Sequence, residues 1–391
     1  MTGTVVLSEL MVSRAGSIDP AKFPEERFDL YSIPSFDRGS ADIVAGAEIG
    51  SSKQIIRTND VLLSKIVPHI RRSWIVGPSR GKRLIASGEW IVFRSERADP
   101  AYLRHVLTGD PFHSQFMATV SGIGGSLLRA RPAFVGQIQV PLPSIEEQRR
   151  IAAILDRADA LRAKRREAVG HLDELRRSVF LDMFGSACRE WPMTDVGSLV
   201  DPARGGIRTG PFGSQLLTSE FTEDGVAVLG IDNAVQNKFT WSERRFISVE
   251  KYEKLKRYTV NAGDVLITIM GTCGRAAVVP PEIPLSINTK HLCCITLDQK
   301  RCTPQYLHAY FLGHPVARDY LSRTAKGAIM SGLNMGIIKD LPVILPPLSL
   351  QGKFGERLSG VDKTLRESQS GLDALDALFA SLQQRAFSGQ L

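Results

Sequence analysis

Cysteine is scarce in this chain of 391 residues, and its distribution excludes two kinds of cross-linked domain. All five cysteines lie after residue 187, and no two of them form a Cys-x-x-Cys pair: they are Cys188, Cys273, Cys293, Cys294 and Cys302. A disulfide framework or a structural zinc site needs paired thiols at regular spacings. We therefore expect reduced cysteines and no metal ion.

Long hydrophobic runs are also absent. No run of about 18 apolar residues is available to span a bilayer. The segment Met1 to Leu10 has no basic stretch followed by a sustained apolar one, as an export signal would. With 43% hydrophobic and 23% charged residues, the composition is that of a globular protein. We expect a cytoplasmic protein of two or three domains with no membrane partner.

Catalytic signatures are missing as well. The chain contains no Asn-Pro-Pro-Phe or Asp-Pro-Pro-Tyr segment to position a flipped base, and no Phe-x-Gly-x-Gly loop for S-adenosylmethionine. Its histidines do not fall at metal-ligand spacings. The sequence thus predicts a protein that is not itself an enzyme.

What the chain does contain is an internal duplication. Asp60-Val61-Leu62-Leu63 recurs 204 positions later as Asp264-Val265-Leu266-Ile267, and Pro100-Ala101-Tyr102-Leu103 recurs at the same offset as Pro304-Gln305-Tyr306-Leu307. Leu142-Pro143 followed by Gln148 recurs 203 positions later as Leu345-Pro346 followed by Gln351. One deleted residue explains the change of offset, so two globular copies are expected.

Each copy alternates short β-rich segments with turns and then gives way to a helix. Runs rich in Val, Ile and Trp predict strands at Gln54–Ile56, Asp60–Val67, Trp74–Val76 and Glu89–Arg94, and at Gly225–Ile231, Asp264–Met270, Arg275–Val279 and His291–Thr296. Pro100–Thr108 and Pro304–Leu312 each carry proline in the first turn, which is typical of a helix start. The fold class expected for each copy is mixed α/β (α+β).

A long helix is expected after each copy. Ser144 and Glu147 make a capping box, and between them and Phe184 there is no proline and one glycine, Gly170. Such a helix is about 60 Å long. Apolar residues recur at spacings of three and four, in the first helix at Ile151, Ile154, Ala158, Leu161, Ala168, Leu172, Leu175 and Val179, and in the second at Phe354, Leu358, Val361, Leu365, Leu372, Leu375, Phe379 and Leu382.

Two apolar seams of equal length predict an antiparallel coiled coil within the chain. A globular domain separates the helices, so this pairing would hold the two domains at opposite ends of a rod. The alternative is that each helix packs on its own domain as ordinary core. The formal charge of +8 favours a polyanionic partner, since neutralised phosphates release counterions.

The residues resemble a known family. Arg208 to Leu216, reading RTGPFGSQL, resembles the Thr-Gly-Pro-Phe-Gly-Ser segment of specificity subunits of type I restriction-modification systems. The segments LPSIEEQ, ending at Gln148, and LPPLSLQ, ending at Gln351, resemble the start of that family's two spacer helices. Lys326-Gly327 followed by Asn334, and Ser121-Gly122 in the first copy, resemble its glycine-bearing turn. The ordered set spans essentially the whole chain.

The resemblance implies two target-recognition domains, at residues 1–143 and 188–347, and two spacer helices, at 144–187 and 348–391. It implies a non-catalytic subunit that recognises a bipartite asymmetric target in double-stranded DNA. The helices would set the gap and dock two methyltransferase subunits, to which restriction subunits would add. S-adenosylmethionine, ATP and Mg are then expected on those partners and no cofactor on this chain.

The second spacer helix departs from the family pattern. Leu350 replaces the usual Glu before Gln351, and Gly352-Lys353 stands where the first helix has Arg149-Arg150. The residues expected to contact a partner are Gln148, Arg149, Arg150, Gln351 and Lys353. The altered helix, with Gly360 and Gly371 inside it, leaves open a DNA-binding or scaffold protein of the same fold without methyltransferase partners.

Basic and amide side chains near turns are the candidates for DNA contact, because phosphates take Lys or Arg and base edges take Arg, Asn, Gln, Ser or Thr. In the first copy these are Arg71, Arg72, Arg80, Lys82 and Arg83, and in the second Arg204, Arg208, Thr209, Ser214, Gln215, Arg244, Arg245, Asn288, Lys290 and His291. The alternative for each is a solvated loop residue. For Gly210, Pro211 and Gly213 the alternative is a tight turn with Phe212 tucked into the core.

Overall fold

The computed structural model describes residues 3–121, 128–185, 190–241, 243–325 and 333–391. Contacts divide the chain into two units, Met1–Glu167 with Ser370–Leu391, and Ala168–Gln369. Each unit holds one mixed α/β domain together with a part of each long helix. The predicted motifs at Gly122 and at Lys326-Gly327, and Cys188, lie outside the described residues.

The first unit contains a three-stranded sheet and a five-stranded sheet, with helices packed on the former. Its strands are β1 (Thr4–Val6), β2 (Ser17–Ile18), β3 (Arg27–Tyr31), β4 (Asp42–Ala45), β5 (Lys53–Ile55), β6 (Val61–Ser64), β7 (Ser73–Ile75), β8 (Arg83–Ala86), β9 (Trp90–Phe93), β10 (Val120–Ser121), β11 (Arg129–Ala130) and β12 (Gln139–Pro141). Its helices are α1 (Ile33–Asp37), α2 (Pro100–Thr108), α3 (Asp110–Ala118), α4 (Pro132–Val135) and the start of α5 (Ile145–Phe184).

The second unit repeats this plan with a four-stranded and a five-stranded sheet. Its strands are β13 (Met193–Asp195), β14 (Ile207–Thr209), β15 (Phe221–Thr222), β16 (Val226–Leu229), β17 (Phe246–Ile247), β18 (Thr259–Val260), β19 (Val265–Thr268), β20 (Ala276–Val278), β21 (Ser286–Asn288), β22 (Leu292–Ile295) and β23 (Pro342–Ile344). Its helices are α6 (Val249–Leu255), α7 (Pro304–Gly313), α8 (Pro315–Ala325), α9 (Met335–Lys339) and the start of α10 (Leu348–Phe387).

The recurring Asp-Val-Leu segments form the central strands β6 and β19. Val61 and Leu63 face the core that α2 and α5 cover, whereas Leu62 faces a second core around Trp90. Both faces of the strand are therefore buried, which explains an unbroken apolar run instead of an alternating one. The predicted strands and the helices α2 and α7 are confirmed, with boundaries shifted by one to three residues.

The five-stranded sheets share four strands and differ in the fifth. The order β5-β8-β3-β4 in the first unit corresponds to β18-β21-β16-β17 in the second, with β3 parallel to β8 and β16 parallel to β21. The additional strand lies beside β5 in the first unit, as β2, but beside β17 in the second, as β15. The duplicated scaffold is thus extended on opposite edges.

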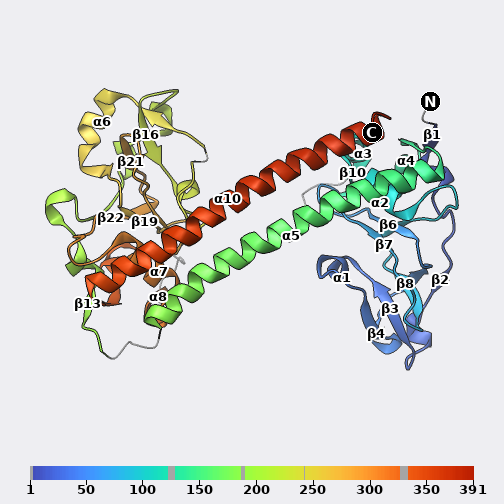
Figure 1. Ribbon diagram of the computed structural model, residues 1–391, viewed down its shortest axis with the longest axis horizontal. Helices are drawn as coiled ribbons and strands as arrows, with labels where there is room; N and C mark the ends of the chain where they lie inside the picture. The colour runs from blue at the N-terminus through green and yellow to red at the C-terminus, as the bar shows by residue number, and fades with distance from the viewer. Residues whose placement is uncertain (1–2, 122–127, 186–189, 242, 326–332) are drawn as a thin grey trace. The chain divides into compact units, whose positions relative to one another are not determined.

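Helices α5 and α10 pair antiparallel inside each unit, where they lie side by side (Figure 1). In the first unit Arg162 donates to Asp376 at 2.5 Å, and in the second Arg176 lies 3.0 Å from Asp362. The later residue of α5 thus pairs with the earlier residue of α10, as expected for the predicted antiparallel arrangement. No helix among the described residues has the length and apolar character needed to cross a membrane.

The predicted apolar seam is wrong in the middle of α5 but holds along α10, where Leu372 is buried. On α5, Leu161 and Leu175 are 54% and 45% exposed, and residues 163–168 are exposed throughout. The buried positions of α5 lie where the helix covers a domain core, as Ile151 and Leu155 do in the first unit. The alternative of ordinary core packing therefore holds at the helix ends, and ion pairs between the helices supplement it.

Candidate nucleic-acid interface

A buried glutamine joins each domain to its long helix. Gln148 accepts a hydrogen bond from the Asp99 backbone N–H at 2.8 Å and donates to the carbonyl oxygens of Arg97 and Pro143, both at 2.9 Å. Asp99 also caps α2 through its carboxylate. The glutamine therefore fixes the start of α2 against the start of α5.

The second unit repeats these contacts through Gln351. Its amide oxygen accepts from the Thr303 backbone N–H at 2.8 Å, and its amide nitrogen donates to the carbonyl oxygens of Arg301 and Pro346 at 3.1 and 2.9 Å. The prediction that Gln148 and Gln351 contact a partner is wrong, because both side chains are fully buried within their own unit. Both glutamines recur in the repeated motif because each connects its domain to the start of a long helix.

The other residues expected at a partner contact are exposed. Arg149 is 69% exposed, and Lys353 is exposed beside the buried Gln351. Arg150 pairs with Glu147 on its own helix and also donates to the Leu391 carbonyl oxygen at 2.7 Å. The hydrogen bond from Arg150 lowers the pKa of the Glu147 carboxyl. Arg149 and Lys353 remain predicted contacts.

The basic residues expected to bind DNA in the first unit are mostly neutralised by carboxylates. Arg80 donates to the buried Asp29 at 2.6 Å. The remaining pairs are Arg72 with Asp37, Arg83 with Glu26, and Arg71 with Asp110. Arg72 is 8% exposed, so its prediction as a DNA contact is wrong: the side chain is an interior ion-pair partner. Lys82 forms no ion pair within the described part of the chain.

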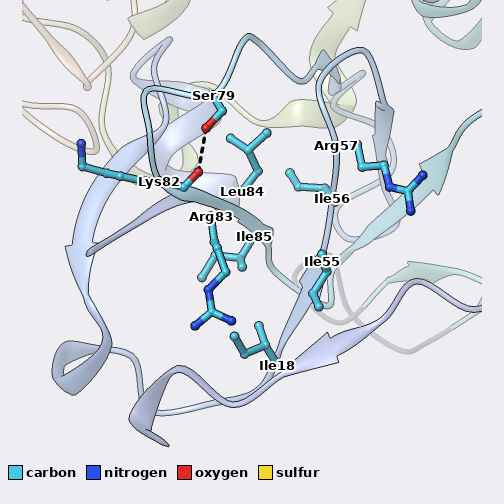
Figure 2. Close-up of a pocket in the computed structure, with 9 residues that line it drawn as sticks. All are labelled: Ile18, Ile55, Ile56, Arg57, Ser79, Lys82, Arg83, Leu84 and Ile85. Carbon is cyan, nitrogen blue, oxygen red and sulfur yellow. Dashed lines mark hydrogen bonds between the residues drawn. The ribbon is translucent and has the colours of Figure 1, made fainter. Parts of the chain in front are cut away.

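A small apolar pocket lies between β5 and β8 of the first unit, with a volume of about 260 Å³. Figure 2 shows Ile18, Ile55 and Ile85 around it, while the Lys82 side chain extends away. The guanidinium of Arg83 also lies 4.3 Å from the ring centroid of Phe23. Arg83 therefore joins the start of β8 to the segment before β3 through an aromatic contact with Phe23 as well as an ion pair with Glu26.

In the second unit, Arg208 is an interior residue. It is 9% exposed and donates to Asp264 and to the hydroxyl of Thr296, both at 2.9 Å, and to the Thr259 carbonyl oxygen. Its prediction as a DNA contact is wrong, because strand β14 directs the side chain under the sheet toward a buried carboxylate. Arg208 fixes the strand from which the glycine-rich segment leaves.

The glycine-rich segment after β14 presents an aromatic side chain to solvent. A Cβ on Gly210 would lie 2.0 Å from the carbonyl oxygen of Asn288, so only glycine fits there. Gly213 has φ +58° and reverses the chain direction. The alternative that placed Phe212 in the core is wrong, since the residue is 51% exposed.

The polar residues of this segment have different roles. Ser214 is exposed and Thr209 is partly exposed. The Gln215 amide oxygen accepts from the Phe212 backbone N–H at 3.3 Å and from the Tyr258 hydroxyl at 3.0 Å. Gln215 therefore stabilises the turn, whereas the exposed Ser214 side chain is available to a partner.

The other candidates in the second unit divide between interior and surface. Asn288 is fully buried and donates to the Leu292 carbonyl oxygen at 3.0 Å, so its prediction as a DNA contact is wrong. Arg245 pairs with Asp232. Arg204, Arg244 and Lys290 form no ion pair with any described residue, while His291 is partly exposed, and its burial lowers the pKa of the imidazole.

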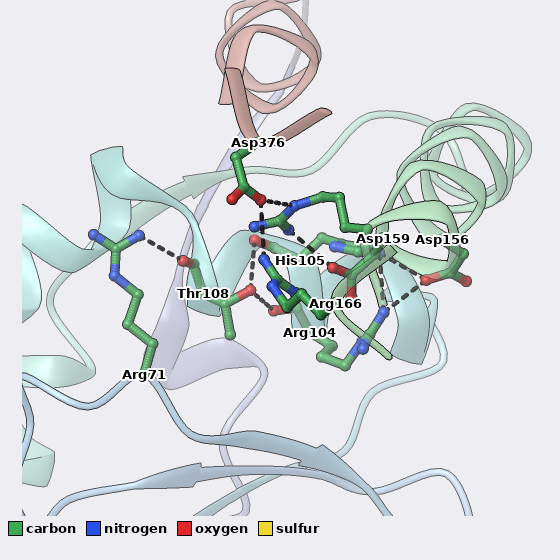
Figure 3. A network of polar contacts seen from close by, with 9 residues as sticks. Arg71, Arg104, His105, Thr108, Asp156, Asp159, Arg166 and Asp376 are labelled. Atoms are coloured by element: carbon green, nitrogen blue, oxygen red, sulfur yellow. Dashed lines mark hydrogen bonds and ion pairs between the residues drawn. The ribbon is translucent and has the colours of Figure 1, made fainter. Parts of the chain in front are cut away.

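A polar network in the first unit connects α2 with both long helices. Asp156 on α5 accepts from Arg104 at 2.6 Å and lies 2.7 Å from His105, whose pKa is lowered mainly by burial. On α10, Asp376 accepts from Arg162 and Arg166, and the Arg162 hydrogen bond lowers the pKa of that carboxyl. Figure 3 shows these groups facing one another.

The cleft beside this network has a volume of about 460 Å³. Arginines and aspartates line it together: Arg71, Arg104 and Arg162 with Asp110, Asp159 and Asp376. The mixture is suited to holding the helices on the domain and gives no net attraction for phosphate. Among the described residues, no three His, Cys, Asp or Glu side chains gather as a metal site.

The chain is similar to known proteins over most of its length. Residues 213–373 match the family model described as type I restriction modification DNA specificity domain. The EcoBI specificity subunit of Escherichia coli is 24% identical over 77% of this chain and 68% of its own length. The MjaVIII specificity subunit of Methanocaldococcus jannaschii is 20% identical over 65% of this chain and 62% of its own length.

Residues 213–373 carry a type I restriction modification DNA specificity domain, and most of the chain is similar to specificity subunits of type I restriction enzymes. Its matched part spans about two thirds of the length of these relatives.

Solved structures of specificity subunits have the same fold. A chain from a study of complex assembly and conformational transition of a type I system matches with a TM-score of 0.58 and 20% identity, covering 100% of this chain and 98% of that one. The specificity subunit from M. genitalium matches with a TM-score of 0.58 and 12% identity, covering 98% and 96%. This chain therefore shares its fold with both structures.

Several residues that position the glycine-rich segment were not predicted from the sequence. Asp264 and Tyr258 position the glycine-rich segment through Arg208 and Gln215. Arg257 is exposed beside Tyr258. The basic run from Lys254 to Arg257 was visible in the sequence, but the distance between positions 215 and 258 concealed the contact.

Proposed function

We propose that this specificity subunit recognises a bipartite, asymmetric sequence in double-stranded DNA and directs adenine methylation, and cleavage, by partner subunits. One domain reads each half of the target. The main observation in support is that the two domains share four strands of their five-stranded sheets but differ in the fifth. Strand β2 extends the sheet of the first unit, and β15 extends the opposite edge of the sheet in the second.

The duplicated scaffold supports two similar modes of DNA binding. The same four strands and the same buried glutamine recur in both units, so each domain is attached to its helix in the same way. The segments that differ, including the glycine-rich turn present only in the second unit, supply different side chains. Different side chains at base edges read different half-sites.

Cations that are at least partly exposed and form no ion pair with a described residue are the proposed phosphate contacts. These are Lys82 in the first unit and Arg204, Arg244 and Lys290 in the second, with Thr209 and Ser214 available to base edges. The formal charge of +8 supports binding to DNA by release of counterions.

The long helices are the proposed spacer and docking surface. Two methyltransferase subunits bind beside the helix starts, where Arg149 and Lys353 are exposed, and restriction subunits add to that complex. S-adenosylmethionine, ATP and Mg then belong to those partners. The complex acts on DNA in the cytoplasm.

The test is long-read mapping of modified adenines in the host genome with and without this gene. Loss of one split motif, with two specific halves and a constant gap, on deletion supports the proposal. Unchanged methylation contradicts it and favours a scaffold protein without methyltransferase partners. Complementation with Arg204→Ala and Lys290→Ala together should weaken methylation of that motif, whereas Lys22→Ala, at an exposed cation outside the long helices and the proposed contacts, should not.

A further inference from the structure

Phe212 is an exposed aromatic side chain on a segment built to hold it outward. It is 51% exposed, and Leu217, five residues later, is 48% exposed. Both lie beside single turns of 3₁₀ helix, at Gly213–Gln215 and Thr218–Glu220. Single exposed apolar side chains are common on protein surfaces, so the exposure of Phe212 is informative only together with what holds it and which charges lie nearby.

The turn that carries Phe212 is fixed from two sides. On one side, Gly210 packs so closely against the backbone of Asn288 that no side chain fits between them. On the other, Gln215 accepts from the Phe212 backbone N–H and from the hydroxyl of Tyr258, which is buried. The aromatic ring therefore projects from an ordered base, and little conformational entropy is lost when it inserts into a partner.

A cation lies beside each of the two contacts that fix the turn. Arg257 donates to the Tyr258 hydroxyl at 2.6 Å, and its guanidinium lies 4.7 Å from the centroid of that ring. Lys290 directly follows Thr289, whose backbone borders Gly210. Neither cation forms an ion pair with a described residue, so two positive charges near the base of this segment are available to phosphates.

We propose that Phe212 is a wedge that inserts between two adjacent base pairs of the half-site read by the second unit. This inference rests on the proposed function, since it names how that unit engages its DNA. Arg257 and Lys290 bind the phosphates that flank the opened step. Apolar wedges partially unstack a base step and bend the duplex, and flexible pyrimidine–purine steps favour this deformation.

The wedge adds a specificity determinant that forms no hydrogen bond with a base. A half-site containing a flexible step at the insertion point would bind more tightly than one with a stiff step there. Base–aromatic stacking is sequence-tolerant, so the preference comes from the deformation of the DNA. The first unit has no Thr-Gly-Pro-Phe-Gly segment, so the distortion is expected in one half of the target only.

The experiment uses the full chain in complex with its methyltransferase subunits. Duplexes carrying the mapped split target receive 2-aminopurine singly at each position of both halves, because its fluorescence rises when the base is unstacked. The methyltransferase subunits should raise fluorescence at the adenines that they flip, and the wild-type complex should raise it at one further step, in one half only. Phe212→Ala should abolish that rise and weaken binding to the target about tenfold, whereas Phe212→Trp should retain both.

Val249→Ala is the matched control, because Val249 is 59% exposed in the same unit on α6 and should leave the fluorescence and affinity unchanged. The wedge is overturned if the wild-type complex binds and methylates the target without unstacking any step other than those at the methylated adenines. It is also overturned if Phe212→Ala keeps the signal, or if it prevents assembly with the methyltransferase subunits, which would assign the ring to a protein contact. Failure of the proposed function is a separate result: no split motif is found for the wild type.

Discussion

Arg208 forms an ion pair with Asp264 inside the second unit, with 2.9 Å between the Nη2 and Oδ2 atoms. Asp60 is the equivalent of Asp264 in the first unit, but its partner is Arg94, which follows β9. In the second unit that position is Thr296, and its hydroxyl accepts from Arg208. The duplicated domains thus keep a buried carboxylate and take its guanidinium from different strands.

Because the two buried aspartates have different arginine partners, we expect the two units to lose different amounts of stability when the arginine is removed. Arg208→Ala should lower the free energy of unfolding of the second unit by about 3 to 5 kcal/mol, because it leaves a buried carboxylate unpaired. Arg94→Ala should have a smaller effect on the first unit, because the Arg94 side chain is 32% exposed and water can replace it. Urea unfolding monitored by fluorescence measures both. Equal losses would contradict the explanation.

The buried glutamines should be needed to attach each domain to its helix. Gln148→Ala removes three hydrogen bonds and leaves the Asp99 N–H and two carbonyl groups unsatisfied, at a cost of about 2 to 4 kcal/mol. Hydrogen exchange should then accelerate at Asp99, whereas Thr303, which Gln351 holds in the other unit, stays protected. Arg157→Ala, at an exposed position further along α5, should change neither amide. Exchange that is unaltered at Asp99 would refute this role.

Glycines at different positions should respond in opposite directions to alanine. Gly210→Ala should destabilise the second unit by about 1 to 3 kcal/mol, because its Cβ would overlap the carbonyl oxygen of Asn288. Gly170→Ala and Gly360→Ala, on open faces of α5 and α10, should each stabilise by about 1 kcal/mol through helix propensity. Thermal unfolding of the three variants gives the comparison. A stabilising Gly210→Ala would exclude the close approach.

Stability should fall below neutral pH because of His308. Burial lowers the pKa of its imidazole to about 4, while Nε2 lies 3.0 Å from the Ala276 carbonyl oxygen and 3.1 Å from that of Asn237. The folded pKa is below the ordinary 6.5. Between those pH values the unfolded chain therefore binds a proton that the folded chain excludes, and about 3 kcal/mol of stability is lost as the pH falls.

His308→Gln keeps a donor for these carbonyl groups but cannot take up the proton. The difference in unfolding free energy between the wild type and this variant should therefore change in the variant's favour from pH 7 to pH 4. Parallel pH profiles for the two proteins would show that His308 is not the group responsible. His105 and His314, whose pKa values burial also lowers, contribute equally to both profiles.

Local patterns were sufficient for the repeat, the strands and the long helices. The Asp-Val-Leu segments became the central strands β6 and β19, and Ser144 accepts from the Glu147 backbone N–H at the start of α5, as its capping motif predicted. Such features depend on neighbours within a few residues, so the order of residue types determines them.

The seam and the functional surface depended on tertiary structure. Leu161 has the correct spacing for a seam yet is exposed, because spacing describes a face of the helix and does not say what covers it. Arg72 and Arg208 have the residue type of DNA contacts, but distant carboxylates hold them inside, whereas Phe212 has the type of a core residue and is held outward by Gln215 and Gly210. Sequence by itself determined the elements and their duplication. Tertiary structure alone decided which side chains face solvent, because burial and ion pairing depend on segments brought together from far apart in the chain.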